Sequence, residues 1–498
     1  MFKHAQFESV QAFVAHPAHA GLPLHARIQR AIRQLILDGA LGAGKPLPAS
    51  RTLARSLDVS RDTVEAAYAQ LHAEGFITRR VGSGSFVSKM TRFAGKRPIS
   101  RALRLDPVAG GPTPGLSRRG MAIFQGGGVR EHLEPRPFAP GVPETRSFPI
   151  SLWERLQRQV LRELGARALH HGDPQGMEHL RRVIADYVNL ERGGHATADR
   201  IVVLTSSQQA LSLCATVLLD PGDPILIEDP AYYGARKAFD AAGLTCVPIG
   251  VDAQGLQVGQ LRDAPNARAV FLTPSHQFPT GATLSLDRRL ALIEWAARNQ
   301  AWIIEDDYDS EFHYSGKPTA CVQGLDPHDR TIYIGTFTKS LFPGLRLAYV
   351  VLPPQLVQPM TVARTLLDGH TASIAQLTLA RFIEGGHFGA HIRAMRGIYA
   401  KRLQTLENAV RQHLGGIAEP LPPLGGLQMP CILTGAISES VAIGAARRIG
   451  IELTSLSGLY AAPGGQPGWL MGFAAYTPEE IDIAARRLAE ALKAVRPA

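Results

Sequence analysis

Apolar residues recur at two different spacings along the chain, and the change between them divides it. In residues 24–37 and 61–74 the apolar positions lie three or four residues apart, with basic residues between them in the first segment, which predicts amphipathic helices. Beyond about residue 138, short apolar runs alternate with longer helical patterns. The chain is therefore expected to begin with a small helical domain and to continue as a larger α/β domain.

The small domain has the pattern of a helix-turn-helix. Ser50 is an expected N-cap for a short helix ending near Leu57, and Ser60 is an expected N-cap for the helix that starts at Arg61. The tight connection between these two helices is typical of the motif. Residues 76–87 then predict two short strands about a Gly-Ser-Gly turn, which would form a small wing.

The larger domain contains five apolar runs, bounded by turn residues and separated in several places by helical patterns. Such alternation predicts a buried, mostly parallel sheet. Ligand sites in these sheets form at the carboxyl ends of the strands, so the residues after each run are candidates for chemistry. The runs are residues 201–204, 225–227, 269–272, 302–304 and 331–334, and the helices are expected at 207–219, 232–242 and 285–300.

Polar groups of complementary kinds follow three of these runs. Residues 205–209 open a helix, where backbone N–H groups favour an anion such as phosphate. Residues 305–309 are dense in carboxylates, and Lys339 lies among small hydroxyl residues after the last run. Pyridoxal phosphate needs an amine for its aldehyde, an anion for its ring nitrogen and donors for its phosphate. Each signal is weak alone, but their order along the chain favours this cofactor.

Composition narrows the possibilities for the 498 residues. Apolar residues make up 45% and charged residues 19%, which is typical of a folded protein. No uncharged apolar stretch reaches the ~18 residues of a membrane span, and the first residues lack the apolar core of a secretion signal. The four cysteines lie far apart and form no Cys-x-x-Cys pair. We therefore expect a cytoplasmic protein without a metal site and without contact to a membrane.

The net charge of +10 is distributed unevenly. Residues 1–120 hold 18 Lys and Arg against 7 Asp and Glu, whereas the rest of the chain is nearly neutral. Clustered cations displace counterions from phosphates, so the basic part is expected to bind nucleic acid, although a solvated basic face is the alternative. Gly and Pro recur over residues 89–136 without periodicity, which predicts a flexible linker.

The small basic domain at the start of the chain resembles the winged helix-turn-helix of the GntR family. Residues 47–87, LPASRTLARSLDVSRDTVEAAYAQLHAEGFITRRVGSGSFV, match the pattern of that family throughout. The resemblance implies a domain over residues 21–88 that binds double-stranded DNA. The residues implied to contact DNA are Arg51, Ser60, Arg61 and Thr63, with Gly82 and Ser83 at the tip of the wing. The arginines could contact phosphates or read guanines, and Arg79 and Arg80 could add phosphate contacts.

Residues 137–498 resemble a fold-type-I aminotransferase domain, which has a large and a small subdomain. The motifs that carry the resemblance are HGDPQGMEHLRRVIADYV (171–188), TSSQQAL (205–211), EDPAYYGAR (228–236), TPSHQFPTG (273–281), EDDYDSEFHY (305–314) and GTFTKSLFPGLRLAYVVLP (335–353). Together the two halves resemble the MocR group of GntR-like regulators. In the TPSHQFPTG motif, His276 and Gln277 replace part of the aminotransferase signature Asn-Pro-Thr-Gly.

The resemblance implies a role for each residue that matches these motifs. Lys339 would form a Schiff base with pyridoxal phosphate, and Asp306, rather than Asp307, would pair with the ring nitrogen. Tyr308 would hydrogen-bond the phenolic oxygen, and Tyr232 would stack on the ring. The residues implied to surround the phosphate are Ser206, Ser207, Gln208, Thr336, Thr338 and Arg346. A head-to-tail homodimer is also implied.

One position departs from the pattern of amino-acid aminotransferases. These enzymes commonly hold the substrate carboxylate with an arginine near the C-terminal strand, where this chain has Leu470. We therefore expect a transcription regulator that senses pyridoxal phosphate or a small amine or amino acid, and no complete transamination. The alternatives are a working aminotransferase with an accessory DNA-binding head, or a cofactor fold that serves only for dimerisation. Effector, operator and direction of regulation are not encoded in any pattern.

Overall fold

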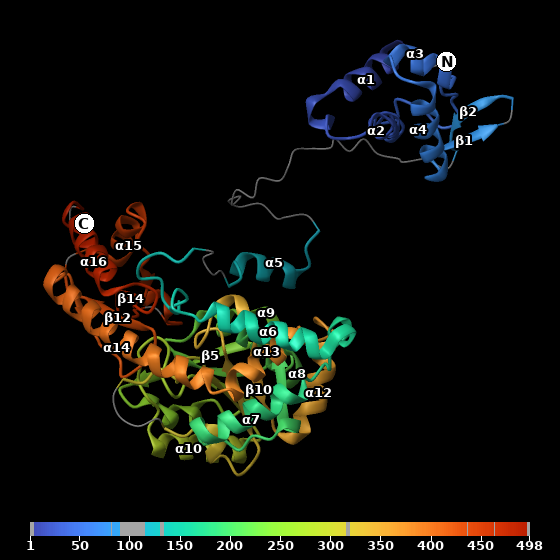
Figure 1. Ribbon diagram of the computed structural model, residues 1–498. Coiled ribbons are helices and arrows are strands. Elements are labelled where there is room, and N and C mark those ends of the chain that lie inside the picture. Colours follow the sequence, from blue (N-terminus) through green and yellow to red (C-terminus); the bar gives the residue numbers. More distant parts are fainter. Residues whose placement is uncertain are drawn as a thin grey trace. The chain divides into compact units, whose positions relative to one another are not determined.

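The structure is a computed structural model that describes residues 4–80, 82–89, 115–129, 134–314, 319–435, 437–462 and 464–495. The chain divides into two compact units, residues Met1–Gly111 and Pro112–Ala498 (Figure 1). We refer to them as the head and the body. No helix among the described residues is long and apolar enough to cross a membrane.

The head contains the predicted winged helix-turn-helix. Its elements are α1 (His4–Ala15), α2 (Leu24–Leu37), α3 (Ser50–Leu57), α4 (Arg61–Ala73), β1 (Ile77–Arg80) and β2 (Gly84–Val87). The face of α4 that includes Val64 and Leu71 is buried against α2, and β1 pairs with β2 antiparallel to form the wing. The helix-turn-helix connection is tight because Asp58 ends α3 in the left-handed conformation, with φ +53°.

Two details of the head differ from the sequence-based expectations. Helix α1 precedes the expected domain start at residue 21, yet its Val10 and Val14 are buried in the core of the head. Ser50 is not the N-cap of α3; it is the first helical residue, Ala49 holds the cap position, and no side chain caps this helix. The predicted cap of α4 is confirmed, since the Ser60 side chain accepts a hydrogen bond from the Thr63 amide.

The segment expected to be a flexible linker includes a helix. Helix α5 (Arg118–Gly126) is capped at its start by Ser117 and ends where Gly127 takes φ +71°. It packs beside α9 (Tyr233–Ala242), and the Arg119 guanidinium donates a hydrogen bond of 2.8 Å to the Ala241 carbonyl. This part of residues 89–136 is therefore attached to the body. The remaining expected linker residues 90–114 and 130–133 lie outside the described residues.

The large subdomain of the body is built on an eight-stranded sheet of order β3-β10-β9-β8-β7-β4-β5-β6. Strands β4, β5, β7, β8 and β9 are parallel, whereas β10 and β6 pair with their neighbours antiparallel. All five predicted runs are strands of this sheet. The strands are β3 (Ile201–Leu204), β4 (Pro224–Asp229), β5 (Thr245–Asp252), β6 (Gly255–Leu256), β7 (Ala269–Leu272), β8 (Trp302–Asp307), β9 (Thr331–Thr336) and β10 (Ala348–Val351).

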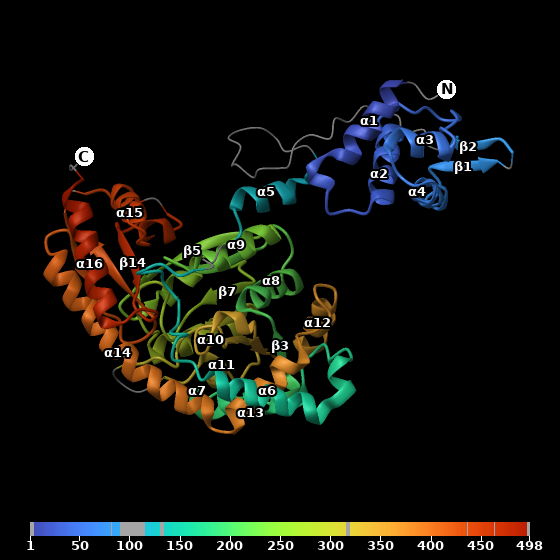
Figure 2. The same cartoon turned by 45° about the horizontal axis from the view of Figure 1, so that its top comes forward.

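Helices cover both faces of the sheet (Figures 1 and 2). The core on one face includes Val203 and Tyr333 together with residues of α7 and α13, and the core on the other includes Val202 and Ile304 with residues of α8 and α9. Alternate residues of each strand thus serve opposite layers. The helices of this subdomain are α6 (Ile150–Leu164), α7 (Glu178–Arg192), α8 (Ser207–Leu218), α9, α10 (Leu286–Asn299), α11 (Val322–Leu325), α12 (Pro354–Thr365) and α13 (Ser373–Glu384).

The small subdomain has an antiparallel sheet of order β11-β12-β14-β13. Its strands are β11 (Ala418–Pro420), β12 (Gln428–Leu433), β13 (Thr454–Ser455) and β14 (Gly468–Gly472). The long helix α14 (His387–His413) leads into it, and α15 (Glu439–Arg448) and α16 (Pro478–Lys493) pack against one another there (Figure 2).

Candidate cofactor site and DNA-binding surface

Two neighbouring carboxylates at the end of β8 have opposite environments. Asp307 accepts hydrogen bonds from the Arg192 guanidinium at 2.7 Å and from the Tyr333 hydroxyl at 2.6 Å. Asp306 is only 3% exposed, and its Oδ1 has no hydrogen-bond partner. Burial, with the charges of Asp307 and Asp309, raises the pKa of Asp306 to about 7, while Lys339 opposes that shift. Arg192 therefore holds Asp307 in its charged form, whereas Lys339 offsets the burial of Asp306 only in part.

Lys339 lies in the turn after β9 and points toward a glycine of the loop before α6. Its Nζ donates a hydrogen bond of 2.8 Å to the Gly141 carbonyl oxygen. A Cβ at Gly141 would approach that nitrogen to 3.1 Å, and the residue has φ +70°, so both space and backbone conformation favour glycine. The sequence analysis missed Gly141, because it is almost two hundred residues from Lys339.

Tyr308 stands at the boundary between the two subdomains. Its hydroxyl accepts a hydrogen bond of 3.3 Å from Gln428 of β12, and the Oε1 atom of that glutamine is buried without a partner. Burial, followed by the charges of Asp309 and Asp306, holds the pKa of Tyr308 well above its usual value. The site is therefore assembled from both subdomains, and Gln428 is a second residue that the sequence analysis missed.

An aromatic rim continues from Tyr308. The ring of Phe278 lies edge-on to Tyr308 at 6.2 Å between centroids, and edge-on to Tyr232 at 5.6 Å. Tyr232 occupies the N-cap position of α9 and is half-buried. Phe278 was not among the expected site residues. An apolar residue within the TPSHQFPTG motif gave no chemical signal, and only the fold places it between two tyrosines.

The expected phosphate-binding residues lie at the start of α8 and after β9. Ser206 is the N-cap of α8 and accepts from the Gln209 amide at 3.2 Å, while Ser207 is the first helical residue. Gln208 donates to the Gly234 carbonyl at 2.9 Å, and its Oε1 is buried without a partner. A helix start with these groups presents N–H donors of the kind that bind anions.

Two threonines and an arginine complete this set. The Thr336 hydroxyl accepts a hydrogen bond of 3.2 Å from the Thr338 amide, and both side chains are buried. Arg346 follows β9 by ten residues and takes a left-handed conformation with φ +53°. Its side chain is exposed and has no hydrogen-bond or ion-pair partner among the described residues. It is therefore a free cation on the surface of the body.

His276 and Gln277, which replace part of the aminotransferase signature, make structural contacts. The His276 Nδ1 lies 2.9 Å from the Asp309 Oδ1, and Asp309 is 1% exposed. Gln277 donates to the Pro230 carbonyl at 2.8 Å and thereby connects the ends of β7 and β4. Both side chains fix the loop that carries Phe278.

Leu470 is fully buried in the centre of β14, between Pro430 of β12 and Thr454 of β13. It belongs to an apolar cluster that also contains Tyr233 and Phe278. The same Phe278 ring contacts Tyr232 and Tyr308. The residues next to the aromatic rim are therefore apolar at the position where amino-acid aminotransferases commonly have an arginine.

The expected DNA contacts of the head are exposed. Arg51 near the start of α3 and Arg61 at the start of α4 have no hydrogen-bond or ion-pair partner among the described residues. Ser60 is exposed and Thr63 is half-buried, and their hydroxyl groups lie 2.8 Å apart. The two unpaired guanidinium groups can therefore bind phosphates or base edges without first breaking an ion pair.

The wing adds a second exposed segment. Gly82 and Ser83 form the turn between β1 and β2, and Gly82 takes φ +74°, which favours glycine. Arg79 and Arg80 are less free than the arginines of the helices. Arg79 pairs with Glu65 at 3.3 Å, and the Arg80 guanidinium lies 4.9 Å from the centre of the Phe86 ring.

No group of three or more His, Cys, Asp or Glu side chains is arranged to hold a metal ion within the part of the chain that the structure describes. The four cysteines, Cys214, Cys246, Cys321 and Cys431, are free. Burial raises the pKa of each of these thiols, so the reactive thiolate form is disfavoured.

Comparison with known proteins agrees with this architecture. Residues 144–488 match the family described as aminotransferase class I and II, and residues 24–87 match the bacterial regulatory proteins of the gntR family. Among solved structures, the kynurenine aminotransferase of Pyrococcus horikoshii is similar with a TM-score of 0.67 and 28% identity, over 72% of this chain and 90% of that one. The multiple substrate aminotransferase of Thermococcus profundus gives a TM-score of 0.68 and 27% identity, over 76% and 97%.

Relatives that match along nearly the whole chain are regulators. The probable rhizopine catabolism regulatory protein MocR of Rhizobium meliloti is 34% identical, over 93% of this chain and 92% of that protein. The pyridoxine biosynthesis transcriptional regulator PdxR of Corynebacterium glutamicum is 30% identical, over 94% and 96%. The chain therefore belongs to the MocR subfamily of transcriptional regulators, in which a GntR-type helix-turn-helix domain precedes an aminotransferase class I and II domain.

Proposed function

We propose that this regulator binds pyridoxal phosphate in its body and changes its binding to DNA when a small amine, or the cofactor itself, occupies that site. The observation that carries the proposal is the buried Asp306, whose Oδ1 has no hydrogen-bond partner and whose pKa is raised by burial, a rise that the nearby charge of Lys339 offsets only in part. A buried carboxyl group that feels the charge of a nearby amine provides two of the groups that this cofactor requires.

The remaining residues fit the other parts of the cofactor. When bound, pyridoxal phosphate supplies an aldehyde and an electron-accepting ring. Lys339 provides the amine that holds the aldehyde covalently. Ionised Asp306 would accept a hydrogen bond from the protonated ring nitrogen, and this cation beside the buried carboxylate would offset the cost of its burial. Tyr308 donates a hydrogen bond to the phenolic oxygen, and Tyr232 covers the face of the ring.

The phosphate is expected at the start of α8. Its charge suits the free N–H groups and the dipole of that helix, and Arg346 adds a charge-assisted donor. Ser206 already caps α8, so it contributes mainly through its backbone position. The residues proposed to surround the phosphate are Ser206, Ser207, Gln208, Thr336, Thr338 and Arg346.

The apolar wall around Leu470 bears on the effector. A substrate carboxylate placed there would lack a charge-assisted hydrogen bond of about 1.5–3 kcal/mol, and burial would disfavour its charge. An amine with an apolar substituent in place of the carboxylate would instead contact Leu470 and Phe278. Sensing of such an amine, rather than transamination of ordinary amino acids, is therefore the activity we propose for this site.

The head is the part of the chain that would bind DNA. Arg51 and Arg61, with the wing residues Gly82 and Ser83, are proposed to bind double-stranded DNA, and a head-to-tail homodimer would place two heads on paired half-sites. Because phosphate contacts release counterions, the affinity is expected to fall steeply as salt rises.

The decisive experiment measures cofactor and DNA together. Purified full-length protein should retain pyridoxal phosphate with a visible absorbance that disappears in Lys339→Ala and persists in the control Lys401→Ala, an exposed lysine of α14. Addition of a primary amine should change both this absorbance and the affinity for the protein's own promoter region. Absence of the absorbance in the unaltered protein, or sustained turnover between an amino donor and a keto acceptor, would contradict the proposal.

A further inference from the structure

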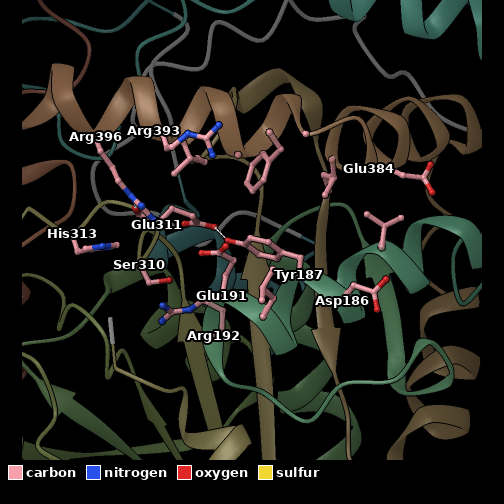
Figure 3. Close-up of a pocket in the computed structure, with 17 residues that line it drawn as sticks. Asp186, Tyr187, Glu191, Arg192, Ser310, Glu311, His313, Glu384, Arg393 and Arg396 are labelled. Atoms are coloured by element: carbon pink, nitrogen blue, oxygen red, sulfur yellow. Dashed lines mark hydrogen bonds between the residues drawn. The ribbon is translucent and has the colours of Figure 1, made fainter. Parts of the chain in front are cut away.

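A cavity of about 540 Å³ lies in the body, lined by α7, the end of α13, the first turns of α14 and the segment that follows β8 (Figure 3). One wall is apolar and includes Val183, Phe388 and Ile392. The Tyr187 ring lies edge-on to Phe388, with 5.4 Å between centroids. This volume is within the range of roughly 300–1,000 Å³ that is usual for small-molecule sites.

Two buried polar atoms of residues that line this cavity have no partner. The Glu311 Oε1 accepts a hydrogen bond of 2.8 Å from the Tyr187 hydroxyl, but its Oε2 has none, and neither has the His313 Nδ1. Burial raises the pKa of Glu311 to about 7 and lowers that of His313. Buried polar atoms are nearly always hydrogen-bonded in native proteins, so an occupant of the cavity is expected to supply the missing partners.

Figure 3 shows arginines of α14 and the pair Asp186 and Glu384 at opposite ends of the cavity, which Glu191, Arg192 and Glu311 also line. Arg393 and Arg396 project from α14 at one end, and Asp186 and Glu384 lie at the other. Among the described residues, Arg393 and Asp186 have no hydrogen-bond or ion-pair partner. Arg396 donates through its Nε to the Glu311 carbonyl at 2.6 Å, a bond that leaves its charge unbalanced.

Two other charged groups at the cavity are already paired, whereas the exposed Glu191 has no hydrogen-bond or ion-pair partner among the described residues. Arg192 is neutralised by Asp307 at 2.7 Å, and Glu384 lies 3.1 Å from the His179 ring. Arg393 can thus bind an anion and Asp186 a cation at opposite ends of the cavity, and both residues are exposed, so a ligand can reach them without first breaking an ion pair. A simple cation would leave the arginine end unmatched, and a simple anion would leave the carboxylate end unmatched.

We propose that this cavity binds a small zwitterion, whose carboxylate faces Arg393 and Arg396, whose ammonium group faces Asp186, and whose apolar middle contacts Phe388. The site shares no residue with the proposed cofactor site, so it stands or falls independently of that function. It is nevertheless close in sequence, since Glu311 follows Asp306 by five residues at the end of β8.

The probes are chosen so that they cannot react with the cofactor. A quaternary ammonium nitrogen has no N–H and cannot condense with an aldehyde, so trimethylammonio carboxylates of increasing chain length report only on non-covalent binding. Titration calorimetry on the full-length protein should show saturable binding for one member of this series. Its affinity should exceed that of hexyltrimethylammonium or hexanoate at least ~10-fold, because each of these satisfies only one end of the cavity.

Three variants locate the binding. Arg393→Gln should weaken the zwitterion ~10-fold and leave hexyltrimethylammonium nearly unchanged. Gly389→Leu should block binding by filling the cavity, and the helix tolerates it because a Cβ there meets only the flexible end of Arg393 at 3.4 Å. Arg411→Gln, an exposed arginine of the same helix, is the matched control and should bind normally.

Each possible result of these binding experiments either supports the proposal or contradicts it. Selective zwitterion binding that Gly389→Leu and Arg393→Gln both weaken would support the proposal. If no member of the series binds, if the cation or the anion alone binds as tightly, or if binding survives both variants, the proposal is wrong. Thermal unfolding of each variant without ligand shows that it is folded, and the retained cofactor absorbance shows that the other site is intact.

Discussion

Two exposed arginines of the head and a buried arginine of the body differ in what their charges can bind. In the head, Arg51 and Arg61 are exposed without partners among the described residues, so their charge is available to an external polyanion. In the body, Arg192 is 4% exposed and is bonded to Asp307 and Ser275. Removal of the Arg51 or Arg61 charge should therefore cost binding, whereas removal of the Arg192 charge should cost folding.

The same contrast separates two neighbours on β8. The Asp307 Oδ2 accepts hydrogen bonds from Arg192 and Tyr333, and because these contacts outweigh the effect of burial, the pKa of Asp307 is lowered. Asp306 lacks such a partner, and its pKa is raised to about 7. A buried carboxylate with a partner within the chain is structural, whereas a buried carboxyl group without one is prepared for a partner from outside.

The largest expected effect is on the buried pair. Arg192→Ala leaves Asp307 buried and uncompensated, so the free energy of unfolding of the body should fall by about 3–5 kcal/mol. Urea denaturation measures it, with Arg411→Ala as the exposed control, for which we expect a change of less than about 0.5 kcal/mol. Equal losses in both variants would remove the distinction between buried and exposed arginines.

The second effect is on DNA binding. Arg61→Ala should weaken binding to the promoter region by about 1–3 kcal/mol while leaving stability nearly unchanged. Arg33→Ala is the control in the same head, because Arg33 is paired with Glu74 at 3.3 Å. Fluorescence anisotropy over a range of salt concentrations is the measurement. Unchanged affinity in Arg61→Ala would show that α4 does not contact DNA.

The third effect concerns pH and sharpens the comparison of the two aspartates. Because the pKa of Asp306 is raised from 3.8 to about 7, the folded state holds more protons than the unfolded state between these values. Its contribution to stability is therefore complete below pH ~4 and is lost as the pH rises toward 7. In cofactor-free protein, Asp306→Asn should make the dependence of unfolding on pH shallower by up to about 1.4 kcal/mol per pH unit.

The contribution of Asp307 to stability is expected to change with pH in the opposite direction, and Asp307→Asn tests this. Its pKa is lowered in the folded state, so its contribution is present above the usual value and is lost as the pH falls. Urea unfolding from pH 4 to 8 follows the contribution of Asp306, and urea unfolding below pH ~4 follows that of Asp307, so the two series distinguish the variants. The same pH dependence in Asp306→Asn as in the unaltered protein would contradict the raised pKa, and unchanged cofactor binding in that variant would contradict the proposed pairing with the ring nitrogen.

The smallest effect separates structure from recognition at Ser60. Its side chain caps α4, so Ser60→Ala should cost the head about 1 kcal/mol of stability. Ser60→Asp should preserve the cap, since aspartate is an equally good N-cap, but should weaken DNA binding by repulsion of phosphate. Thermal unfolding and anisotropy on both variants test this. Normal DNA binding by the aspartate variant would remove Ser60 from the contact surface.

Local patterns predicted the elements well where neighbours in the sequence decide the structure. The apolar face of α4, its Ser60 cap and the five buried strands required only residues within one element. Helix α5 was missed because it lies in a Gly- and Pro-rich segment and none of its residues is buried. Strand β10 was missed because a short apolar run next to Lys339 gave no separate signal.

The sequence by itself determined that a small basic domain precedes a nearly neutral domain. In the second domain, a lysine and a pair of carboxylates each follow a predicted strand. The resemblance implied Asp306 as the partner of the ring nitrogen, but local patterns could not show why Asp307 is different, because only packing against α7 brings Arg192 to Asp307. Nor could they place Gly141, Gln428 and Phe278 beside the motif residues. Gly141 and Gln428 lie more than a hundred residues from Lys339 and Tyr308, and Phe278 lies at least thirty residues from both tyrosines that it contacts. Tertiary structure alone decides which such segments meet.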